Sequence, residues 1–354
     1  MARFSLDQLS HPIVQAPLAG GPSTAALAAA VSEAGGLGFL AAGYKSAAAV
    51  GEEIAAVREA TERPFGVNLF VPSSVGAGEG GPRAESVARY ADAVRSDAER
   101  LGAEVGEPRQ DDDGWGEKLA LVRELRPAVV SFAFGLPQAE TVAGLQAAGC
   151  AVWVTVTTPA EARTAAAVGA DALGVQGVEA GGHRGSFDDG APGEIGLLAL
   201  LQLVRSTVDL PLVAAGGIMT GGGIAAALAA GARAVQLGSA FMLTPEAGTS
   251  APHRAALAVP GDTALTRAFS GRLARGIVNR FMRDHGAGAP SAYPEVHHIT
   301  SPLRAAARAS GDGDAINLWA GQAHELARAV PAGELVRTLS DEARAALGAA
   351  AERL

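Results

Sequence analysis

Residues 171–185 read Asp171-Ala-Leu-Gly-Val-Gln-Gly-Val-Glu-Ala-Gly-Gly-His-Arg-Gly185, a short apolar run followed by a glycine-rich segment. The first half, 172–176, has the makeup of a buried strand. The second half is predicted to be an irregular loop, because its glycines permit backbone shapes that other residues avoid. A buried strand that leads into a glycine loop with a histidine is typical of a βα loop in an α/β enzyme. The chemistry is therefore expected in this stretch, where His183 and Arg184 stand among the glycines.

The same succession of an apolar run and a helical pattern recurs along the chain. It predicts eight strands, each followed by a helix-like segment, at residues 13–16, 36–40, 65–69, 128–132, 150–156, 172–176, 212–215 and 234–237. Continuous apolar strands suit a parallel sheet that is buried on both faces, and eight such units favour a (β/α)8 TIM barrel. An open, doubly wound sheet is the alternative, but that fold does not need eight units.

The alternation of predicted strands and helices is interrupted at two places, and these interruptions suggest the domain organisation. The barrel is expected over residues 1–243, with an insertion at about 72–126 that begins in a glycine- and serine-rich loop at 72–81. Residues 244–330 have mixed character and are expected to form a smaller helical or α/β region beside the barrel mouth. Residues 331–354 are predicted to form an amphipathic helix that docks on its own barrel or on a partner, so a homodimer is possible.

Composition excludes several classes of protein. Hydrophobic residues make up 48% of the 354 residues, which is enough for a large core, and the net charge is −9 with only two lysines. An acidic chain without a basic cluster argues against a nucleic-acid or membrane-surface partner. The chain starts without a signal-peptide pattern and contains no apolar run of membrane-spanning length, so a cytoplasmic protein is expected. The single cysteine, Cys150, precedes apolar residues and is predicted to be buried.

Two glycine turns near the end of the predicted barrel indicate a phosphate site. Gly216 and Gly217 follow the seventh strand, and Gly238 and Ser239 follow the eighth. In barrels of this type the loops after these strands commonly hold a phosphate, because glycines expose backbone amides and a helix N-terminus adds a favourable partial charge. The turns alone do not distinguish a phosphorylated substrate from a cofactor such as flavin mononucleotide (FMN).

Two uncharged amides favour the cofactor. Asn68 and Gln176 lie at or near the ends of apolar strands, where an amide can hydrogen-bond the edge of a flavin ring. Taken singly, each amide could equally bond a neighbouring loop. The two together, with Gly20 and Gly21 after the first strand, suggest a ring that lies across the barrel mouth.

The chain resembles the nitronate monooxygenases, a family of FMN-dependent TIM-barrel enzymes formerly called 2-nitropropane dioxygenases. The similar segments span nearly the whole chain: 12–21, 34–38, 65–70, 174–185, 214–218, 236–239, 270–276 and 318–322. One departure is Leu18, where many members have Met, but Leu provides similar apolar cover. The resemblance implies that His183 is the catalytic histidine and that FMN contacts Asn68, Gln176, Gly181, Gly182, Gly216, Gly217, Gln236, Leu237, Gly238 and Ser239.

The role proposed for His183 has a chemical basis. An imidazole can remove the acidic proton next to a nitro group near neutral pH, which gives the nitronate anion. If the substrate arrives as nitronate, no base is needed and His183 orients the anion instead. The resemblance implies that dioxygen then completes an oxidation to a carbonyl compound and nitrite.

Other charged residues and histidines have less specific interpretations. Arg184 is either a second anion contact or a surface salt-bridge partner, and Lys45 is expected to be solvated. Arg272 and Arg275 either line the mouth or pack between the two regions. The adjacent pair at 297–298 lacks nearby acidic residues at ligand spacing, so no metal is predicted.

Three other functions remain open from the sequence. An FMN-dependent NAD(P)H-using reductase, similar to enoyl-acyl-carrier-protein or quinone reductases, shares the glycine–histidine loop. A flavin-free barrel lyase or isomerase would use the phosphate site for its substrate. A non-catalytic flavin-binding protein would need no histidine chemistry.

Overall fold

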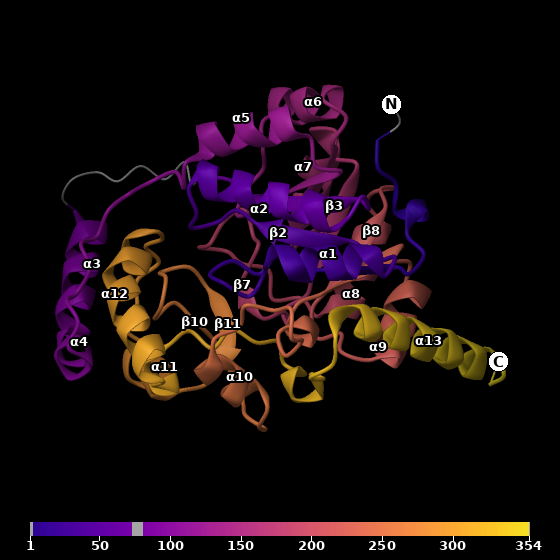
Figure 1. The fold of residues 1–354 in the computed structure, drawn as a ribbon. Coiled ribbons are helices and arrows are strands. Elements are labelled where there is room, and N and C mark those ends of the chain that lie inside the picture. Colours follow the sequence, from indigo (N-terminus) through magenta and orange to yellow (C-terminus); the bar gives the residue numbers. More distant parts are fainter. Residues whose placement is uncertain (1–2, 73–80, 354) are drawn as a thin grey trace.

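The computed structural model describes residues 3–72 and 81–353, and its centre is a closed barrel of eight parallel strands (Figure 1). A bridge between Val14 and Leu37 joins the first and last strands of the order β1-β9-β8-β6-β5-β4-β3-β2. The predicted TIM barrel is therefore confirmed. Its strands are β1 (Ile13–Gln15), β2 (Gly38–Ala41), β3 (Phe65–Phe70), β4 (Val129–Ala133), β5 (Ala151–Val156), β6 (Ala172–Gln176), β8 (Leu212–Ala215) and β9 (Ala234–Leu237).

Side chains alternate between the inside and the outside of the barrel. Inward-facing residues such as Phe39 and Trp153 form one core, and outward-facing residues such as Leu173 and Val175 pack beneath the helices. This alternation follows from the two-residue period of a strand. It brings the inward residues at the strand ends, including Gln176, to the open mouth of the barrel. Cys150, predicted to be buried, is fully buried beside β5.

Helices surround the barrel, and several of them begin where a hydroxyl side chain caps the first turn. Thr24, Ser46, Thr158 and Thr220 each accept a hydrogen bond from a first-turn amide, as N-caps do. The surrounding helices are α1 (Ala25–Glu33), α2 (Ala47–Ala60), α5 (Trp115–Leu125), α6 (Ala139–Ala147), α7 (Pro159–Ala167), α8 (Leu197–Arg205) and α9 (Gly221–Ala229).

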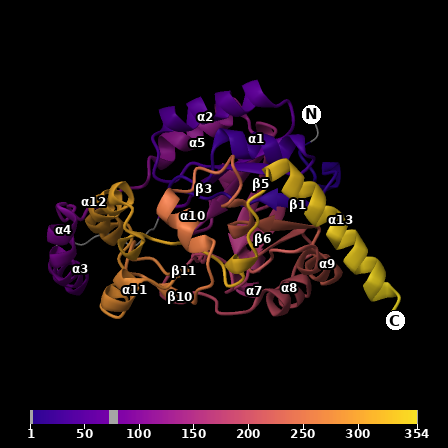
Figure 2. The same ribbon diagram turned by 60° about the horizontal axis from the view of Figure 1, so that its bottom comes forward.

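The C-terminal helix α13 (Ala332–Ala351) packs on α9 and α1 of the same chain (Figure 2). It thus occupies the position of the helix that would follow the last barrel strand. Its apolar face, which includes Leu335, Val336 and Leu339, joins the barrel's outer core. Burial of that face explains why the amphipathic pattern at the end of the chain forms a helix.

A smaller lobe lies beside the barrel mouth. A three-stranded antiparallel sheet in it joins β10 (Thr263–Thr266), β11 (Ala274–Ile277) and the two-residue strand β7 (Gly182–His183). The lobe's helices are α3 (Pro82–Ala93), α4 (Arg95–Leu101), α10 (Ala251–Leu257), α11 (Arg280–His285) and α12 (Glu295–Ser310). Most of the predicted loop at 72–81 lies outside the described residues.

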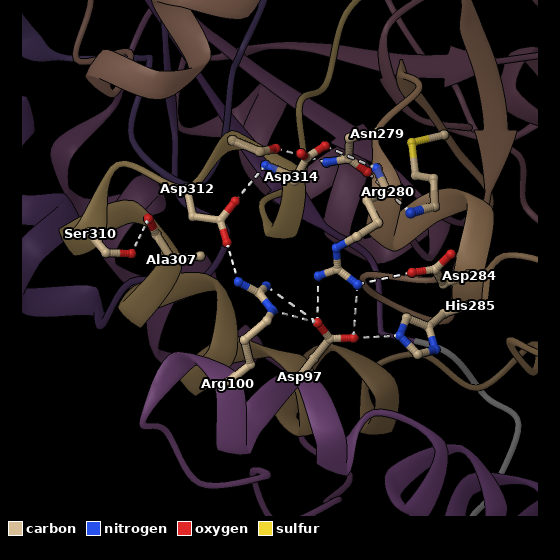
Figure 3. Close-up of polar contacts among 12 residues, drawn as sticks. Asp97, Arg100, Asn279, Arg280, Asp284, His285, Ala307, Ser310, Asp312 and Asp314 are labelled. Atoms are coloured by element: carbon tan, nitrogen blue, oxygen red, sulfur yellow. Dashed lines mark hydrogen bonds and ion pairs between the residues drawn. The ribbon is translucent and has the colours of Figure 1, made fainter.

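Ion pairs attach the insertion helix α4 to the rest of the lobe (Figure 3). The buried carboxylate of Asp97 accepts hydrogen bonds from Arg280, from His285 at 2.7 Å and from Arg100. Arg100 also donates to Asp312 at 2.8 Å, just beyond the end of α12. We call Asp97, Arg100, Arg280, His285 and Asp312 the Asp97 cluster. It holds α4 against α11 and the end of α12.

Candidate active site

A cavity of about 500 Å³ lies at the carboxyl ends of the barrel strands. The strand ends and their loops form one side, and residues of the smaller lobe form the other. Among the described residues no aspartate, glutamate or lysine lines this cavity, and its charged side chains are those of Arg304 and Arg308. The cavity therefore suits ligands that carry negative charge.

Most of the predicted site residues meet at this cavity. His183 lines it together with Asn68, Gln176, Gly181, Gly182, Gly216, Gly217, Gln236, Gly238 and Ser239. Leu237 is different, because it occupies an outward-facing position of β9 and packs in the core between the barrel and its helices. The side chain of Leu237 therefore does not line the cavity.

The two glycine turns follow neighbouring strands, β8 and β9, as the phosphate interpretation requires. Gly216 and Gly217 have φ values of 125° and 66°, which favour glycine. The hydroxyl of Ser239 accepts the Gly321 amide at 2.9 Å, so its own proton remains available for another acceptor. A Cβ atom at Gly238 would come within 3.4 Å of Leu18. This side of the cavity is thus formed by backbone that a ligand can approach closely and by one hydroxyl group.

Part of the helix N-terminus expected to help hold a phosphate, that of α9, already has protein partners. Thr220 accepts the Gly223 amide, and the Glu342 carboxylate of α13 accepts the Gly221 amide at 3.2 Å. Protein groups therefore occupy donors in the first turn of α9. The turn that follows β9 is instead a short 3₁₀ helix, Ser239–Phe241, so Ser239 stands at the start of its own helical turn.

The two amides at the strand ends are held by their neighbours. Asn68 donates to the Ser131 hydroxyl at 2.9 Å. Gln176 donates to the carbonyl of His183 at 3.1 Å and accepts the Gly185 amide at 2.8 Å. Gln176 thereby holds the end of the glycine–histidine segment, at His183 and Gly185, which is the loop-bonding alternative considered for it, while its side chain still borders the cavity.

The prediction that residues after Gln176 form no regular element is wrong in part. Gly182 and His183 pair with Arg275 and Ala274 of β11. The pairing extends a strand from the lobe across the barrel mouth and places the His183 ring at the cavity. Nε2 of that ring lies 2.8 Å from Oγ of Ser270, and the ring meets Phe134, Tyr293 and Trp319 edge-on.

Electrostatics keep the imidazole of His183 neutral. Burial, the largest effect, together with the positive charges of Arg272 and Arg304 lowers the pKa of His183 to about 3. Asp189 acts in the opposite direction but is the weaker influence. A ring with this pKa carries no charge at neutral pH and is a weak base.

The arginines near His183 have structural partners. Arg184 is 1% exposed and donates to the backbone carbonyls of Gly177 and Gly193, so neither interpretation offered for it holds. Arg272 donates to the carbonyls of Arg184 and Ser186 and lies 4.2 Å from the centre of the Phe134 ring. Arg275 likewise binds a backbone carbonyl, that of Val178 at 3.0 Å. Arg272 and Arg275 therefore pack between the barrel and the lobe.

One face of α12 also borders the cavity, and the sequence analysis did not identify it. This face consists of His297, Ser301, Arg304 and Arg308. Their spacing of four, three and four residues places them in one row on a helix. That polar row was visible in the sequence, but only the fold shows that it faces a cavity. Tyr44 and Trp319 join the same border from other parts of the chain.

No group of three or more His, Cys, Asp or Glu that could hold a metal ion occurs in the described part of the chain. His298 bonds Asp111 at 2.6 Å, whereas the neighbouring His297 contacts Arg304 and Tyr44. Lys45 forms an ion pair with Glu53 at 2.6 Å. Within residues 3–72 and 81–353, no helix is long and apolar enough to cross a membrane.

Comparisons with known proteins agree with this geometry. The family model described as "Nitronate monooxygenase" matches residues 4–342. The chain is 45% identical to a nitronate monooxygenase of Pseudomonas aeruginosa, over 95% of this chain and 97% of the other. It is 40% identical to one of Paraburkholderia phytofirmans, over 96% of this chain and 94% of the other.

Solved structures show the same fold. A nitroalkane oxidase from Streptomyces ansochromogenes superposes with a TM-score of 0.92 at 52% identity, covering 97% of this chain and 99% of that one. FabK from Thermotoga maritima superposes with a TM-score of 0.77 at 26% identity, covering 99% and 98%. The similarity to the nitroalkane oxidase is thus the greater of the two in both identity and structure.

Proposed function

Because the chain belongs to the nitronate monooxygenase family, a family of flavoenzymes, we propose that it is an FMN-dependent oxidoreductase that converts alkyl nitronates and dioxygen into carbonyl compounds and nitrite. The observation that carries this proposal is a cavity that combines a neutral histidine with two guanidinium groups and, among the described residues, no carboxylate. Such a cavity attracts an anion and neither protonates nor deprotonates it.

The residues that line the cavity fit FMN. The glycine turns at Gly216–Gly217 and Gly238–Ser239 offer backbone amides and a hydroxyl proton to a phosphate. Asn68, Gln176 and Gln236 offer uncharged amides to a polar ring edge. Gly182 leaves open space where a side chain would stand, whereas Gly181 makes room for the backbone of Ala320 and Gly321. Bound FMN would supply the redox chemistry by which a nitronate and dioxygen give a carbonyl compound and nitrite.

Within this proposal His183 orients the substrate. Its Nε2 faces the Ser270 hydroxyl, which leaves Nδ1 for a substrate oxygen. The Ser270 hydroxyl has one proton: when it goes to the Arg272 carbonyl at 3.2 Å, Nε2 carries the ring proton, and when it goes to Nε2, Nδ1 carries the ring proton and can donate to a nitronate oxygen. A pKa of about 3 makes this ring a weak proton acceptor, so we expect preformed nitronate to be turned over faster than the neutral nitroalkane.

The test uses an oxygen electrode and the FMN-loaded protein. Propyl nitronate should cause oxygen uptake with formation of nitrite, whereas NADPH alone should not. Rapid anaerobic bleaching of the flavin by NADPH, together with no oxygen uptake on propyl nitronate, would overturn the proposal and favour a reductase. Protein that neither contains nor binds FMN would favour a flavin-free barrel enzyme.

A further inference from the structure

A second histidine, His297, borders the same cavity from the other lobe. It lies on α12, while His183 lies on β7. The ring of Tyr293 lies edge-on to both, with its centre 6.2 Å from that of His183 and 6.4 Å from that of His297. His297 is thus close enough to act on the ligand that His183 contacts.

The hydrogen bonds of Arg304 determine which nitrogen of His297 carries a proton. A nitrogen of the Arg304 guanidinium lies 3.2 Å from Nδ1 of His297. A guanidinium only donates, so Nδ1 must be the acceptor and carry no proton. The neutral ring has a single N–H, which is therefore at Nε2. Burial, the largest effect, and the charge of Arg304 lower the pKa of His297 to about 2, which agrees with a neutral ring.

Further contacts hold both partners in place. Arg304 is 7% exposed and also donates to the Thr300 and Ser301 hydroxyls at 3.0 and 2.9 Å. The His297 ring stacks on Tyr44 with centres 4.2 Å apart and planes 5° from parallel. The plane and the tautomer of His297 are both fixed before any ligand binds, which lowers the entropy cost of a later contact.

We propose that His297 is a second substrate-contacting residue, which presents its Nε2–H to a nitronate oxygen, and that Arg304 is the positioning residue that fixes this tautomer. The inference rests on the proposed function, because it takes a nitronate as the ligand. A neutral imidazole N–H can hydrogen-bond an anion. Unlike an imidazolium, it does not readily transfer its proton to that anion. The alternative is that the His297 ring only fills space against Tyr44 and makes no contact with the substrate.

Two replacements of His297 separate these roles. The amide nitrogen of Gln reaches about as far as Nε2 of His, whereas the oxygen of Asn reaches only as far as Nδ1. His297→Gln keeps a donor at the reach of Nε2, whereas His297→Asn keeps an acceptor for Arg304 but its shorter amide places no donor at the Nε2 position. We expect His297→Asn to lower kcat/KM for propyl nitronate roughly ten- to a hundredfold, mainly through KM, and His297→Gln to stay within about threefold of the wild type.

His298 on the same helix provides the matched control. It bonds Asp111 and does not line the cavity, so His298→Asn and His298→Gln should resemble each other and the wild type. Equal activity of His297→Asn and His297→Gln would overturn the inference while leaving the proposed function intact. A wild-type enzyme without nitronate-dependent oxygen uptake would instead overturn both.

The tautomer can be measured without any replacement and without turnover. In the 15N NMR spectrum of histidine-labelled holoenzyme, the His297 ring should show a protonated Nε2 and an unprotonated Nδ1. Arg304→Met should allow the other tautomer, whereas Arg308→Met should not, because Arg308 bonds Asn317 rather than His297. A protonated Nδ1 in the wild type would overturn the inference.

Discussion

His183 and His297 are both neutral and border one cavity, but their partners differ in kind. His183 faces a hydroxyl, Ser270 Oγ at 2.8 Å, which can donate or accept. His297 faces a guanidinium, Arg304 at 3.2 Å, which only donates. The tautomer of His183 can therefore change when a ligand binds, while that of His297 is fixed. The barrel side of the cavity thus carries an adaptable contact, and the lobe side carries a fixed donor.

The same environment explains why both rings are neutral. Burial is the largest effect on the pKa of each, and the charge of Arg304 lowers both values. No carboxylate among the described lining residues compensates for that charge. An anionic substrate would compensate for that charge. The same uncompensated positive charge that keeps the histidines neutral therefore favours the binding of an anion.

The largest effect is expected from replacing the adaptable histidine. His183→Ala should lower kcat/KM for propyl nitronate about a hundredfold or more, because it removes both the anion contact and any proton transfer. The loss with neutral nitropropane should be at least as great. Steady-state oxygen uptake with both substrates measures the two losses.

The matched control is His298→Ala, which removes a histidine that bonds Asp111 and does not line the cavity. A His183→Ala enzyme with wild-type kcat/KM would show that the barrel-side histidine makes no contribution and would reverse the roles assigned here.

A smaller effect is expected from removing the hydroxyl that makes His183 adaptable. Ser270→Ala takes away the partner of Nε2 but leaves the ring on β7, so kcat/KM should fall about tenfold. The 15N shifts of His183 should change in this variant, while those of His297 should not. If both histidines respond equally, the two sides of the cavity are not independent and the comparison fails.

Much of the barrel could be predicted from the sequence, because its strands are short apolar runs with helical patterns between them. Strands β6, β8 and β9 begin and end where the pattern places them. The cavity-facing positions of Gln176 and Gln236 follow from the same alternation that turns Leu237 outward. The family resemblance implies contacts along the whole run 236–239, but the alternation within the strand takes the side chain of Leu237 away from the cavity.

Other features depend on contacts that no local pattern contains. The two-residue strand at Gly182–His183 exists only because β11, some ninety residues later, pairs with it. Arg184 is buried because backbone carbonyls of its own loop surround its guanidinium. The polar row on α12 is a local pattern, but a polar helix face usually faces solvent. Its exposure to the cavity depends on how the lobe sits on the barrel.

The smallest effect on catalysis is expected from a change that loosens only the lobe side. Asp97→Asn removes the negative charge that binds Arg280, Arg100 and His285 in the Asp97 cluster (Figure 3). The carboxylate is 4% exposed, so the free energy of unfolding should fall by about 1–3 kcal/mol. Urea unfolding of the FMN-loaded protein measures this loss.

The effect on turnover should be only a few-fold and should appear in KM, because α12 carries His297 while β7 keeps His183 in place. Asp92→Asn is the matched control: its ion pair with Arg95 is on the same insertion but largely exposed, and such pairs contribute about 0–1 kcal/mol. If Asp97→Asn lowers kcat as strongly as Ser270→Ala does, the Asp97 cluster positions both sides of the cavity. The fixed and adaptable histidines would then depend on one shared support rather than on two.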